Sequence, residues 1–346
     1  MPTKQPTIKE IAKRLNISVS SVSRALHDHP SIGLRTRMRV KQMAEELNYE
    51  PNQTAIFFQQ RKTFTIGVII PDLSEAFFSE AISGIEDTAY KNKYTVLMGQ
   101  SHDDPQKEKQ ILESMKAHRV DGLLVSISKN TAEYSHFEVL KNANIPVVFF
   151  DRIPNMQNIH YVACNMVSGT IQAVKYLHQN GHRVIGLLNG PEKLFSSAER
   201  LDGYRQALDK NRLKYDPSLV VNSDLSQESN FEATRKLLAH KRKVTAIVTF
   251  NDYVAMDAMH FAQQQKVKIN KDVCFVSYAN LPFAHYLRYM PMASVEQYPY
   301  KQGQKATEML LEILSKKDDE RIADPGYYKI ILDSTLVVYD QTAQTI

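Results

Sequence analysis

Several side chains near the N-terminus are spaced to face a partner together. A short helix with apolar periodicity is predicted to begin after Ser18. Its first residues and its outward face carry Val19, Ser20, Ser21 and Arg24. An arginine on such a face can donate two hydrogen bonds to the edge of a guanine, which contributes about 1–3 kcal/mol of discrimination. The pattern predicts contacts with DNA bases, and the alternative is a small helical bundle whose arginine has no special role.

Two further helices are expected to hold this face in place. Thr7 and Glu10 have the spacing of a capping box, and the apolar residues after them continue a helix to about Leu15. Asn16 supplies a tight turn, because asparagine tolerates a positive φ angle. Apolar residues with helical spacing predict a third helix over about residues 34–48. Two helices joined by a tight turn within about twenty residues form a helix-turn-helix.

The basic charge of the chain is confined to this region. Residues 1–62 hold 11 Lys and Arg against 5 Asp and Glu, a net charge of +6, whereas residues 63–346 hold 32 against 33. Cations crowd the first half of the third helix, within reach of phosphates: Arg35, Arg37, Arg39 and Lys41. A basic region on a neutral body is typical of nucleic-acid binding, and the alternative is a solvated basic N-terminus.

A short apolar segment separates the basic region from the rest of the chain. Pro51 prevents the third helix from continuing, Asn52 can cap a new helix, and about two helical turns follow. A helix of this length is not stable alone in water, yet it displays Phe57 and Phe58. An apolar side chain inserted between base pairs of the minor groove would explain both features. The alternative is a linker whose phenylalanines pack on the body.

The remaining sequence alternates short β-branched runs with amphipathic segments of helical length. The runs comprise residues 64–70, 94–98, 122–127, 146–150, 184–188, 246–250 and 273–278. This order predicts parallel sheets with right-handed crossovers, and the length suits two lobes. Ligands of open α/β sheets bind beyond the carboxyl ends of the strands. The residues after the runs are therefore candidates: Pro71, Asp72, Phe77, Phe78, Asp151, Arg152, Asn251, Asp252, Ala279 and Asn280.

The order of these motifs resembles that of the LacI/GalR family of transcriptional regulators. The segments TIKEIAKRLNISVSSVSRAL, NYEPNQTA and TIGVIIPDLSEAFF match the family, and the similarity extends along the whole chain. The resemblance implies a hinge helix after Pro51, with Phe58 at the position where a family leucine levers the minor groove open. We expect the DNA contacts to come from Thr7, Ser18, Val19, Ser20, Ser21, Arg24, Asn52, Ala55 and Phe58.

For the body, the resemblance implies two lobes like those of periplasmic binding proteins around one small-molecule cleft. The segments PVVFFDR, NGHRVIGLLNGP, SSAERLDGYRQAL, AIVTFND and ASVEQ match the family. Carried over position by position, the effector-binding residues are Phe77, Phe78, Asp151, Arg200, Asn251 and Gln297. Aromatic rings beside a carboxylate and a guanidinium suit a sugar or a sugar derivative. The alternative for each residue is core packing or a surface ion pair.

Two positions depart from the family pattern. Ala279 and Cys164 stand where the family carries polar residues. This departure favours a larger, modified or less polar ligand over a simple monosaccharide, and it leaves open a cleft that binds no ligand.

Other classes of protein lack their sequence signals. The chain has no run of about 18 apolar residues and no apolar leader, so we expect a cytoplasmic protein with no membrane partner. We expect Cys164 and Cys274 to be reduced core residues, with no metal site. No Walker loop, dinucleotide glycine motif, GxSxG or HExxH is present, so we expect no enzyme, no catalytic residue and no cofactor. A solute-binding protein for transport would need an export signal.

The expected organisation follows from these patterns. We expect a helix-turn-helix domain at residues 1–50, a hinge helix at 51–62, and an effector-binding and dimerisation domain at 63–346. Its first lobe would comprise about residues 63–163 and 298–325, and its second lobe about 164–293 and 326–340. No heptad follows Tyr339, so we expect a homodimer on a near-palindromic operator. The predicted function is that of a DNA-binding repressor controlled by a small molecule.

Replacement of Phe58 would test the predicted wedge. We expect Phe58→Ala to reduce both the bending of operator DNA and the affinity for it, because an inserted side chain is needed to unstack a base step. Effector binding should be unchanged. Bending can be measured by resonance energy transfer between the two ends of an operator duplex, with Gln59→Ala as the matched control. Unchanged bending would assign Phe58 to linker packing instead.

Overall fold

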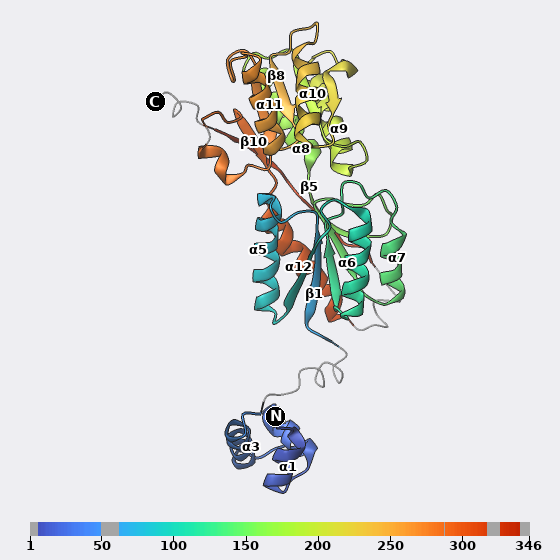
Figure 1. The fold of residues 1–346 in the computed structure, drawn as a ribbon, viewed down its shortest axis with the longest axis vertical. Coiled ribbons are helices and arrows are strands. Elements are labelled where there is room, and N and C mark those ends of the chain that lie inside the picture. The colour runs from blue at the N-terminus through green and yellow to red at the C-terminus, as the bar shows by residue number, and fades with distance from the viewer. Residues whose placement is uncertain (1–5, 50–61, 287, 317–325, 340–346) are drawn as a thin grey trace. The chain divides into compact units, whose positions relative to one another are not determined.

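The computed structural model describes residues 6–49, 62–286, 288–316 and 326–339 (Figure 1). The chain divides into two compact units, Met1–Thr63 and Phe64–Ile346, called here the head and the body. The predicted hinge residues Asn52, Ala55 and Phe58 lie outside the described residues.

The head is a small three-helix unit in its described part. Its helices are α1 (Ile8–Leu15), α2 (Val19–Leu26) and α3 (Leu34–Glu46). All three contribute to one apolar core, in which Ile11, Val22 and Val40 are fully buried. Asn16 ends α1 with a φ angle of 55°, so the turn between α1 and α2 has the left-handed residue that the sequence predicts. The predicted helix-turn-helix is confirmed.

Of the two N-terminal caps predicted in the head, the structure contains one. The capping box at α1 is wrong, because the side chain of Thr7 accepts no hydrogen bond from the helix and Glu10 instead pairs with Arg14 at 2.8 Å. An arginine one turn along the helix competes with the backbone N–H for the Glu10 carboxylate. At α2 the cap is present, since the N–H of Ser21 donates to Oγ of Ser18 at 3.0 Å.

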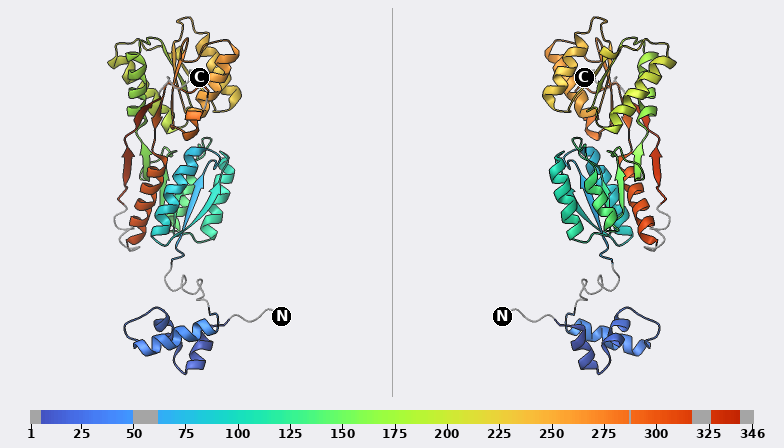
Figure 2. Two further views of the ribbon diagram at one scale, coloured as in Figure 1. Left: turned by 90° about the vertical axis from the view of Figure 1, so that its left-hand side faces the viewer. Right: turned by 90° about the vertical axis from the view of Figure 1, so that its right-hand side faces the viewer.

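The first lobe of the body is a six-stranded sheet covered by helices on both faces (Figures 1 and 2). Its strands are β1 (Thr65–Ile70), β2 (Thr95–Gln100), β3 (Gly122–Val125), β4 (Val147–Phe150), β5 (His160–Cys164) and β11 (Lys329–Leu332). They pair in parallel in the order β11-β5-β4-β3-β1-β2. Helices α5 (Ala76–Lys91) and α12 (Pro299–Ser315) pack on one face, and α6 (Pro105–Ala117) and α7 (Ser135–Asn142) pack on the other.

The second lobe repeats this architecture. Its strands are β6 (Ile185–Asn189), β7 (Val220–Asn222), β8 (Ala246–Thr249), β9 (Cys274–Tyr278), β10 (Ala293–Glu296) and β12 (Thr335–Val338), in the order β12-β10-β9-β8-β6-β7. Helices α8 (Met166–Gln179) and α9 (Phe195–Lys210) cover one face, and α10 (Gln227–Leu238) and α11 (Asp252–Gln264) cover the other. Two short 3-10 helices, η1 (Pro217–Leu219) and η2 (Pro282–Tyr286), complete the lobe.

The predicted α/β architecture is confirmed, with two corrections near the C-terminus. β12 runs antiparallel to β10, so the second sheet is not wholly parallel. The assignment of residues 326–340 to the second lobe alone is wrong, because β11 pairs with β5 in the first sheet and only β12 joins the second. The sequence did not predict β11, because this strand has only four residues and alternates between exposed and half-buried positions. Such a strand carries little apolar signal.

The chain passes between the lobes three times, after β5, after β10 and after β11. Because these strands end at the crossings, the carboxyl edges of the two sheets meet at the boundary between the lobes. Both cysteines, Cys164 and Cys274, are free and buried, as the sequence predicts. Across the ranges that the structure describes, no helix is both long enough and apolar enough to cross a membrane.

Helices α5 and α12 approach closely enough to require glycine. A Cβ atom at Gly303 would lie 2.0 Å from the carbonyl oxygen of Ala81, and one at Gly84 would lie 2.1 Å from that of Tyr300. Real Cβ atoms do not approach backbone so closely, so any larger side chain would push the two helices apart.

Substitution of Gly303 should therefore destabilise the first lobe. We expect Gly303→Ala to lower the free energy of unfolding by about 1–3 kcal/mol, despite the better helix propensity of alanine. Urea unfolding of the full chain measures this change. The control is Gly186→Ala, where the new methyl would meet only the side-chain end of Leu237 at 3.0 Å. A loss no larger than that of the control would contradict the close-packing argument.

Candidate functional site

The outward face of α2 is accessible in the folded head. Val19 is 41% exposed, Ser20 and Arg24 are exposed, and Ser21 is half-buried. The guanidinium of Arg24 makes no hydrogen bond or ion pair with another residue of the described chain. Its five N–H donors are therefore available to an external acceptor such as a base edge.

The first turn of α2 is ordered by serine hydroxyls. Besides capping the helix, Oγ of Ser18 lies 2.8 Å from Oγ of Ser20 and 2.8 Å from Oγ of Ser21. Thr7, the remaining predicted DNA contact in the described head, is exposed at the start of α1. The hydroxyls thus lie at the helix N-terminus, where backbone N–H groups and the helix dipole favour a phosphate.

Half of the cations predicted to reach phosphates from α3 are held within the head. Lys41 forms an ion pair with Asp28 at 2.8 Å, and Arg37 lies 3.9 Å from the same carboxylate. The hydrogen bond from Lys41 lowers the pKa of Asp28. Arg35 and Arg39 are exposed and make no such pair with another described residue. These two are therefore the α3 cations best placed for the DNA backbone.

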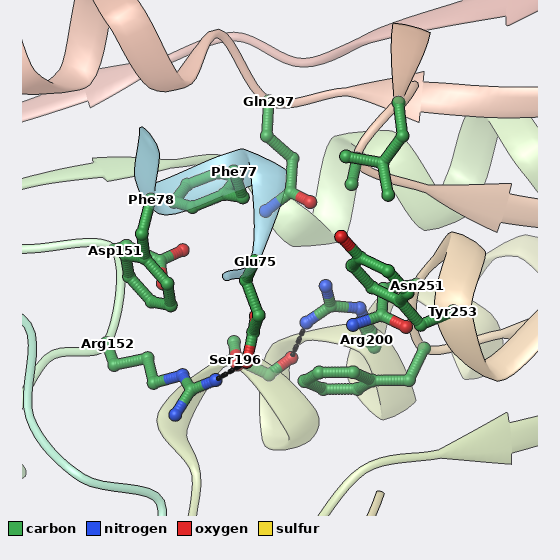
Figure 3. Close-up of a pocket in the computed structure, with 13 residues that line it drawn as sticks. Glu75, Phe77, Phe78, Asp151, Arg152, Ser196, Arg200, Asn251, Tyr253 and Gln297 are labelled. Atoms are coloured by element: carbon green, nitrogen blue, oxygen red, sulfur yellow. Dashed lines mark hydrogen bonds and ion pairs between the residues drawn. The ribbon is translucent and has the colours of Figure 1, made fainter. Parts of the chain in front are cut away.

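In the body, a cavity of about 40 Å³ lies between the two lobes (Figure 3). The structure brings all six predicted effector-binding residues to its wall: Phe77, Phe78, Asp151, Arg200, Asn251 and Gln297. Seven further residues complete the lining: Glu75, Arg152, Ser196, Phe250, Tyr253, Ala279 and Leu281. Residues from strand ends and from helix starts in both lobes thus meet around one space, as the crossing geometry requires.

Sequence reasoning missed several of these lining residues for an identifiable reason. Glu75 is the N-cap of α5, Phe250 follows β8 directly, and Tyr253 lies in the first turn of α11. Each sits within a few residues of a predicted strand end, so its position in the sequence carries a signal for the site. Ser196 lies in the first turn of α9, and Leu281 lies in the connection after β9, whose course only the tertiary structure shows.

Asp151 is placed in the cavity by a strained backbone. It follows β4 with a φ angle of 57°, in the left-handed region that non-glycine residues rarely adopt. The pKa of Asp151 is raised to about 6, mainly by burial; the charges of Arg152 and Arg200 oppose the rise, and the carboxylate of Glu75 adds to it. The Asp151 carboxyl accepts no hydrogen bond from another described residue. This carboxyl group therefore retains its capacity to accept hydrogen bonds.

Arg152 connects the cavity wall to a buried ion-pair network. Its Nη1 lies 2.7 Å from Oδ1 of Asp103, and its Nη2 lies 3.5 Å from Oε1 of Glu75. Lys129 lies 3.8 Å from the second oxygen of Asp103. Burial raises the pKa of Glu75, and the charge of Arg152 opposes that rise. The shorter contact shows that Arg152 is held mainly by Asp103, with Glu75 as its weaker partner.

Arg200 occupies the opposite wall, between two aromatic rings. Its guanidinium carbon lies 4.1 Å from the ring centroid of Phe250 and 4.3 Å from that of Tyr278. Nη1 donates to the backbone carbonyl of Ser196 at 3.1 Å (Figure 3). Nε is buried and has no partner among the described residues. With two rings against the guanidinium, its unpaired Nε and its remaining N–H groups are the donors that a ligand could engage.

The two amide side chains of the wall are partly committed. Oδ1 of Asn251 caps α11 by accepting from the N–H of Val254 at 2.9 Å. The Gln297 side-chain nitrogen lies 3.8 Å from the sulfur of Met166, which is a weak acceptor. Both residues therefore keep polar groups that a ligand can engage.

Two strand-end candidates have a structural role instead. The carboxylate of Asp252 accepts from the backbone N–H of Leu281 at 2.8 Å and from the hydroxyl of Ser294 at 2.9 Å. The side-chain amide of Asn280 donates to Glu296 at 2.8 Å. These bonds fix the loop in which Ala279 adopts a φ angle of 90°.

Two contacts join the lobes beside the cavity. Nζ of Lys129 donates to the backbone carbonyl of Asp224 at 2.9 Å, and the N–H of Ala76 donates to the hydroxyl of Tyr253 at 3.2 Å. Pockets that hold small molecules have volumes of about 300–1,000 Å³, so 40 Å³ has room for only a few water molecules. A ligand the size of a sugar therefore requires the lobes to separate, which would break these contacts.

Two family models match almost the whole chain. Residues 7–52 match bacterial regulatory proteins of the lacI family, and residues 63–327 match periplasmic binding proteins and the sugar binding domain of the LacI family. The chain belongs to the lacI family of bacterial regulatory proteins. It is a DNA-binding transcriptional regulator, and the family resemblance seen in the sequence is confirmed.

Relatives and solved structures agree with this assignment. The chain is 32% identical to catabolite control protein A of Priestia megaterium over 312 residues, covering 90% of this chain and 93% of the relative. It is 31% identical to the transcriptional repressor PurR of Aliivibrio salmonicida, covering 91% and 94%. The structure of CcpA from Lactococcus lactis has a TM-score of 0.71 at 28% identity, covering 79% of this chain and 96% of that one. A lac repressor dimer bound to operator and an anti-inducer shares the fold, with a TM-score of 0.80 at 23% identity, covering 96% and 98%.

The raised pKa of Asp151 predicts a pH-dependent stability. Between pH 3.8 and about 6 the folded chain holds a proton that the unfolded chain has lost, so this group costs more stability as pH rises through that window. As pH rises from 4 to 7, we expect the free energy of unfolding of Asp151→Asn to increase by about 1–3 kcal/mol relative to that of the wild type. Urea unfolding at several pH values measures the difference.

Asp72 provides a control of opposite sign. Hydrogen bonding from Ser74 lowers the pKa of Asp72, so its carboxylate stabilises the fold above pH 3.8. Asp72→Asn should therefore lose stability relative to the wild type as pH rises toward 3.8, and the difference should stay constant at higher pH. A stability difference for Asp151→Asn that does not change with pH would show that its carboxyl is not destabilised by burial.

Proposed function

We propose that the chain is a repressor that binds a near-palindromic operator as a homodimer and is controlled by a small sugar-like molecule in the cavity between the lobes. One observation carries this proposal: a single chain joins the unpartnered face of α2 to a cavity lined by six effector candidates. A two-fold dimer would present two α2 helices to two half-sites in successive major grooves. Because relatives such as PurR are named as repressors, repression is proposed here and not activation.

Base reading would rest mainly on Arg24. It is the long donor on the α2 face, whereas Val19 and Ser20 are small and would contribute apolar contact and single hydrogen bonds. Arg35 and Arg39 would bind phosphates, which position the head without selecting a sequence. Affinity and specificity would therefore depend on different residues.

Control would operate through the arrangement of the lobes. Because the cavity is nearly closed, a ligand must change how the lobes meet, and the contacts of Lys129 and Tyr253 would be remade. The head joins the body through residues 50–61, so a change in the body reaches α2 through this segment. The ligand shifts operator binding only as far as it prefers one arrangement, and a useful switch needs a few kcal/mol of differential affinity.

A screen in two conditions tests the control. Thermal unfolding of the full chain is measured with a panel of sugars and nucleobases, first alone and then with operator DNA selected from random sequence. We expect at least one compound to raise the midpoint temperature of unfolding of the body. The size of this rise should change when operator is present, since coupling between two sites is reciprocal. A ligand that binds equally well with and without operator would contradict effector control.

The Arg24→Ala variant tests base reading. We expect it to weaken binding to the selected operator by about 1–3 kcal/mol and to weaken binding to random DNA by much less. Fluorescence anisotropy at fixed salt measures both affinities. Arg35→Ala is the matched control, because loss of a phosphate contact should weaken both kinds of DNA alike and reduce the salt dependence. Equal losses on both DNAs for Arg24→Ala would assign this residue to the phosphates.

A further inference from the structure

The acidic residues of the cavity wall both come from the first lobe. Of the 13 residues that line the space, Glu75 and Asp151 are the carboxylates, one at the start of α5 and the other after β4. On the second lobe, Ala279 offers only a methyl group. In the view of Figure 3, Asp151 and Arg152 lie on one side and Arg200 on the other, with Glu75 between them. The wall is therefore polarised, with its carboxylates on one lobe.

Both carboxylates have unused hydrogen-bonding capacity. Asp151 accepts no hydrogen bond from another described residue. Glu75 has one such partner, Arg152 at 3.5 Å, which is at the limit of a hydrogen bond, and its side chain is 30% exposed. An ionised carboxylate can accept about four hydrogen bonds. Most of these acceptor positions are therefore open to a ligand.

None of the nearby cations forms an ion pair with Asp151. Arg152 and Lys129 both contact Asp103, and Lys129 also donates to a carbonyl of the second lobe. The first lobe thus places three carboxylates, those of Glu75, Asp103 and Asp151, beside two cations. Arg200 is held in the second lobe by its aromatic neighbours and by its own helix. Asp151 makes no ion pair with another described residue, although the charges of Arg152 and Arg200 oppose the rise of its pKa.

The two cavity carboxylates also repel each other. Both line the same cavity, and the charge of Glu75 adds to the rise in the pKa of Asp151, although Arg152 has the larger and opposite effect. A neutral hydroxyl can donate one hydrogen bond to either carboxylate, but it leaves this repulsion in place. An ammonium group has three donors and a positive charge, so it can bond to both carboxylates and cancel the repulsion.

We propose that the effector is an amino sugar whose protonated amino group binds between Glu75 and Asp151. Its ring would lie against Phe77 and Phe78, and its hydroxyl oxygens would accept hydrogen bonds from the edge of Arg200, whose buried Nε lacks a partner. Glu75 is then the residue that selects an amine over a hydroxyl. This inference rests on the proposed function, which makes the cavity an effector site.

Calorimetric titration of the full chain tests the ligand class. The probes are the 2-amino-2-deoxy forms of glucose, galactose and mannose, each compared with its parent hexose and its N-acetyl derivative at pH 6.5. At this pH the amino group is protonated, and acetylation removes its charge. We expect at least one amino sugar to bind about ten- to a hundredfold more tightly than both matched compounds.

A substitution at Glu75 tests the selecting residue. Glu75→Gln keeps the shape of the side chain and, since Glu75 makes no side-chain cap to α5, leaves the helix start intact. We expect it to reduce the preference for the amino sugar to within about threefold while changing affinity for the parent hexose little. Glu80→Gln is the control, because Glu80 is an exposed carboxylate on the same helix and does not line the cavity. It should leave the preference unchanged.

Three results would overturn the inference. They are equal binding of every amino sugar and its parent hexose, no binding of any probe, and a preference that survives in Glu75→Gln. Operator binding is measured on the same protein by anisotropy, so the two proposals can fail separately. Intact operator binding with no amine preference rejects the amino sugar alone. Loss of sequence-specific DNA binding rejects the repressor proposal and leaves the calorimetric result standing.

Discussion

Charge buried between two lobes is the constraint on which the body depends. An ionised group away from water is tolerated only when other charges and hydrogen bonds compensate it. Asp103 meets this requirement for Arg152 at 2.7 Å, and the rings of Phe250 and Tyr278 meet it for Arg200. Asp151 is the exception, since its carboxyl has no hydrogen-bond donor among the described residues and its pKa rises to about 6. An incompletely compensated site is one that a ligand can stabilise.

The chain path explains why these groups meet. Three crossings between the lobes occur at the carboxyl ends of β5, β10 and β11, so the polar residues that follow the strands face one another. The same crossings leave the lobes joined by short segments and by hydrogen bonds such as those of Lys129 and Tyr253. The head is a separate compact unit with its own small core.

Much of the fold followed from local pattern, and the failures have physical causes. The helices of the head and the longer central strands were predicted because apolar periodicity is strong there. Five strands escaped prediction: β5, β7, β10, β11 and β12. The edge strands β7, β11 and β12 are half-exposed and have three or four residues, so they carry little apolar signal. The inner strands β5 and β10 have only five and four residues. The capping box failed at Glu10 because Arg14 offered a charged partner in place of a backbone N–H. Local competition of this kind depends on side-chain conformations that spacing does not show.

The sequence by itself determined the helix-turn-helix, the α/β class of the body and six residues that line one cavity. These predictions depended on periodicity, on strand ends and on family motifs, which are all features of the linear sequence. Only the tertiary structure decided that Glu75 joins Asp151, that Arg152 is held by Asp103, and that Lys129 reaches across to Asp224. Arg152 and Asp103 are 49 positions apart, and Lys129 and Asp224 are 95 positions apart. Glu75 and Asp151 follow two different strands, β1 and β4. The charge balance of the cavity is a sum over such long-range pairs, so no stretch of sequence could reveal it.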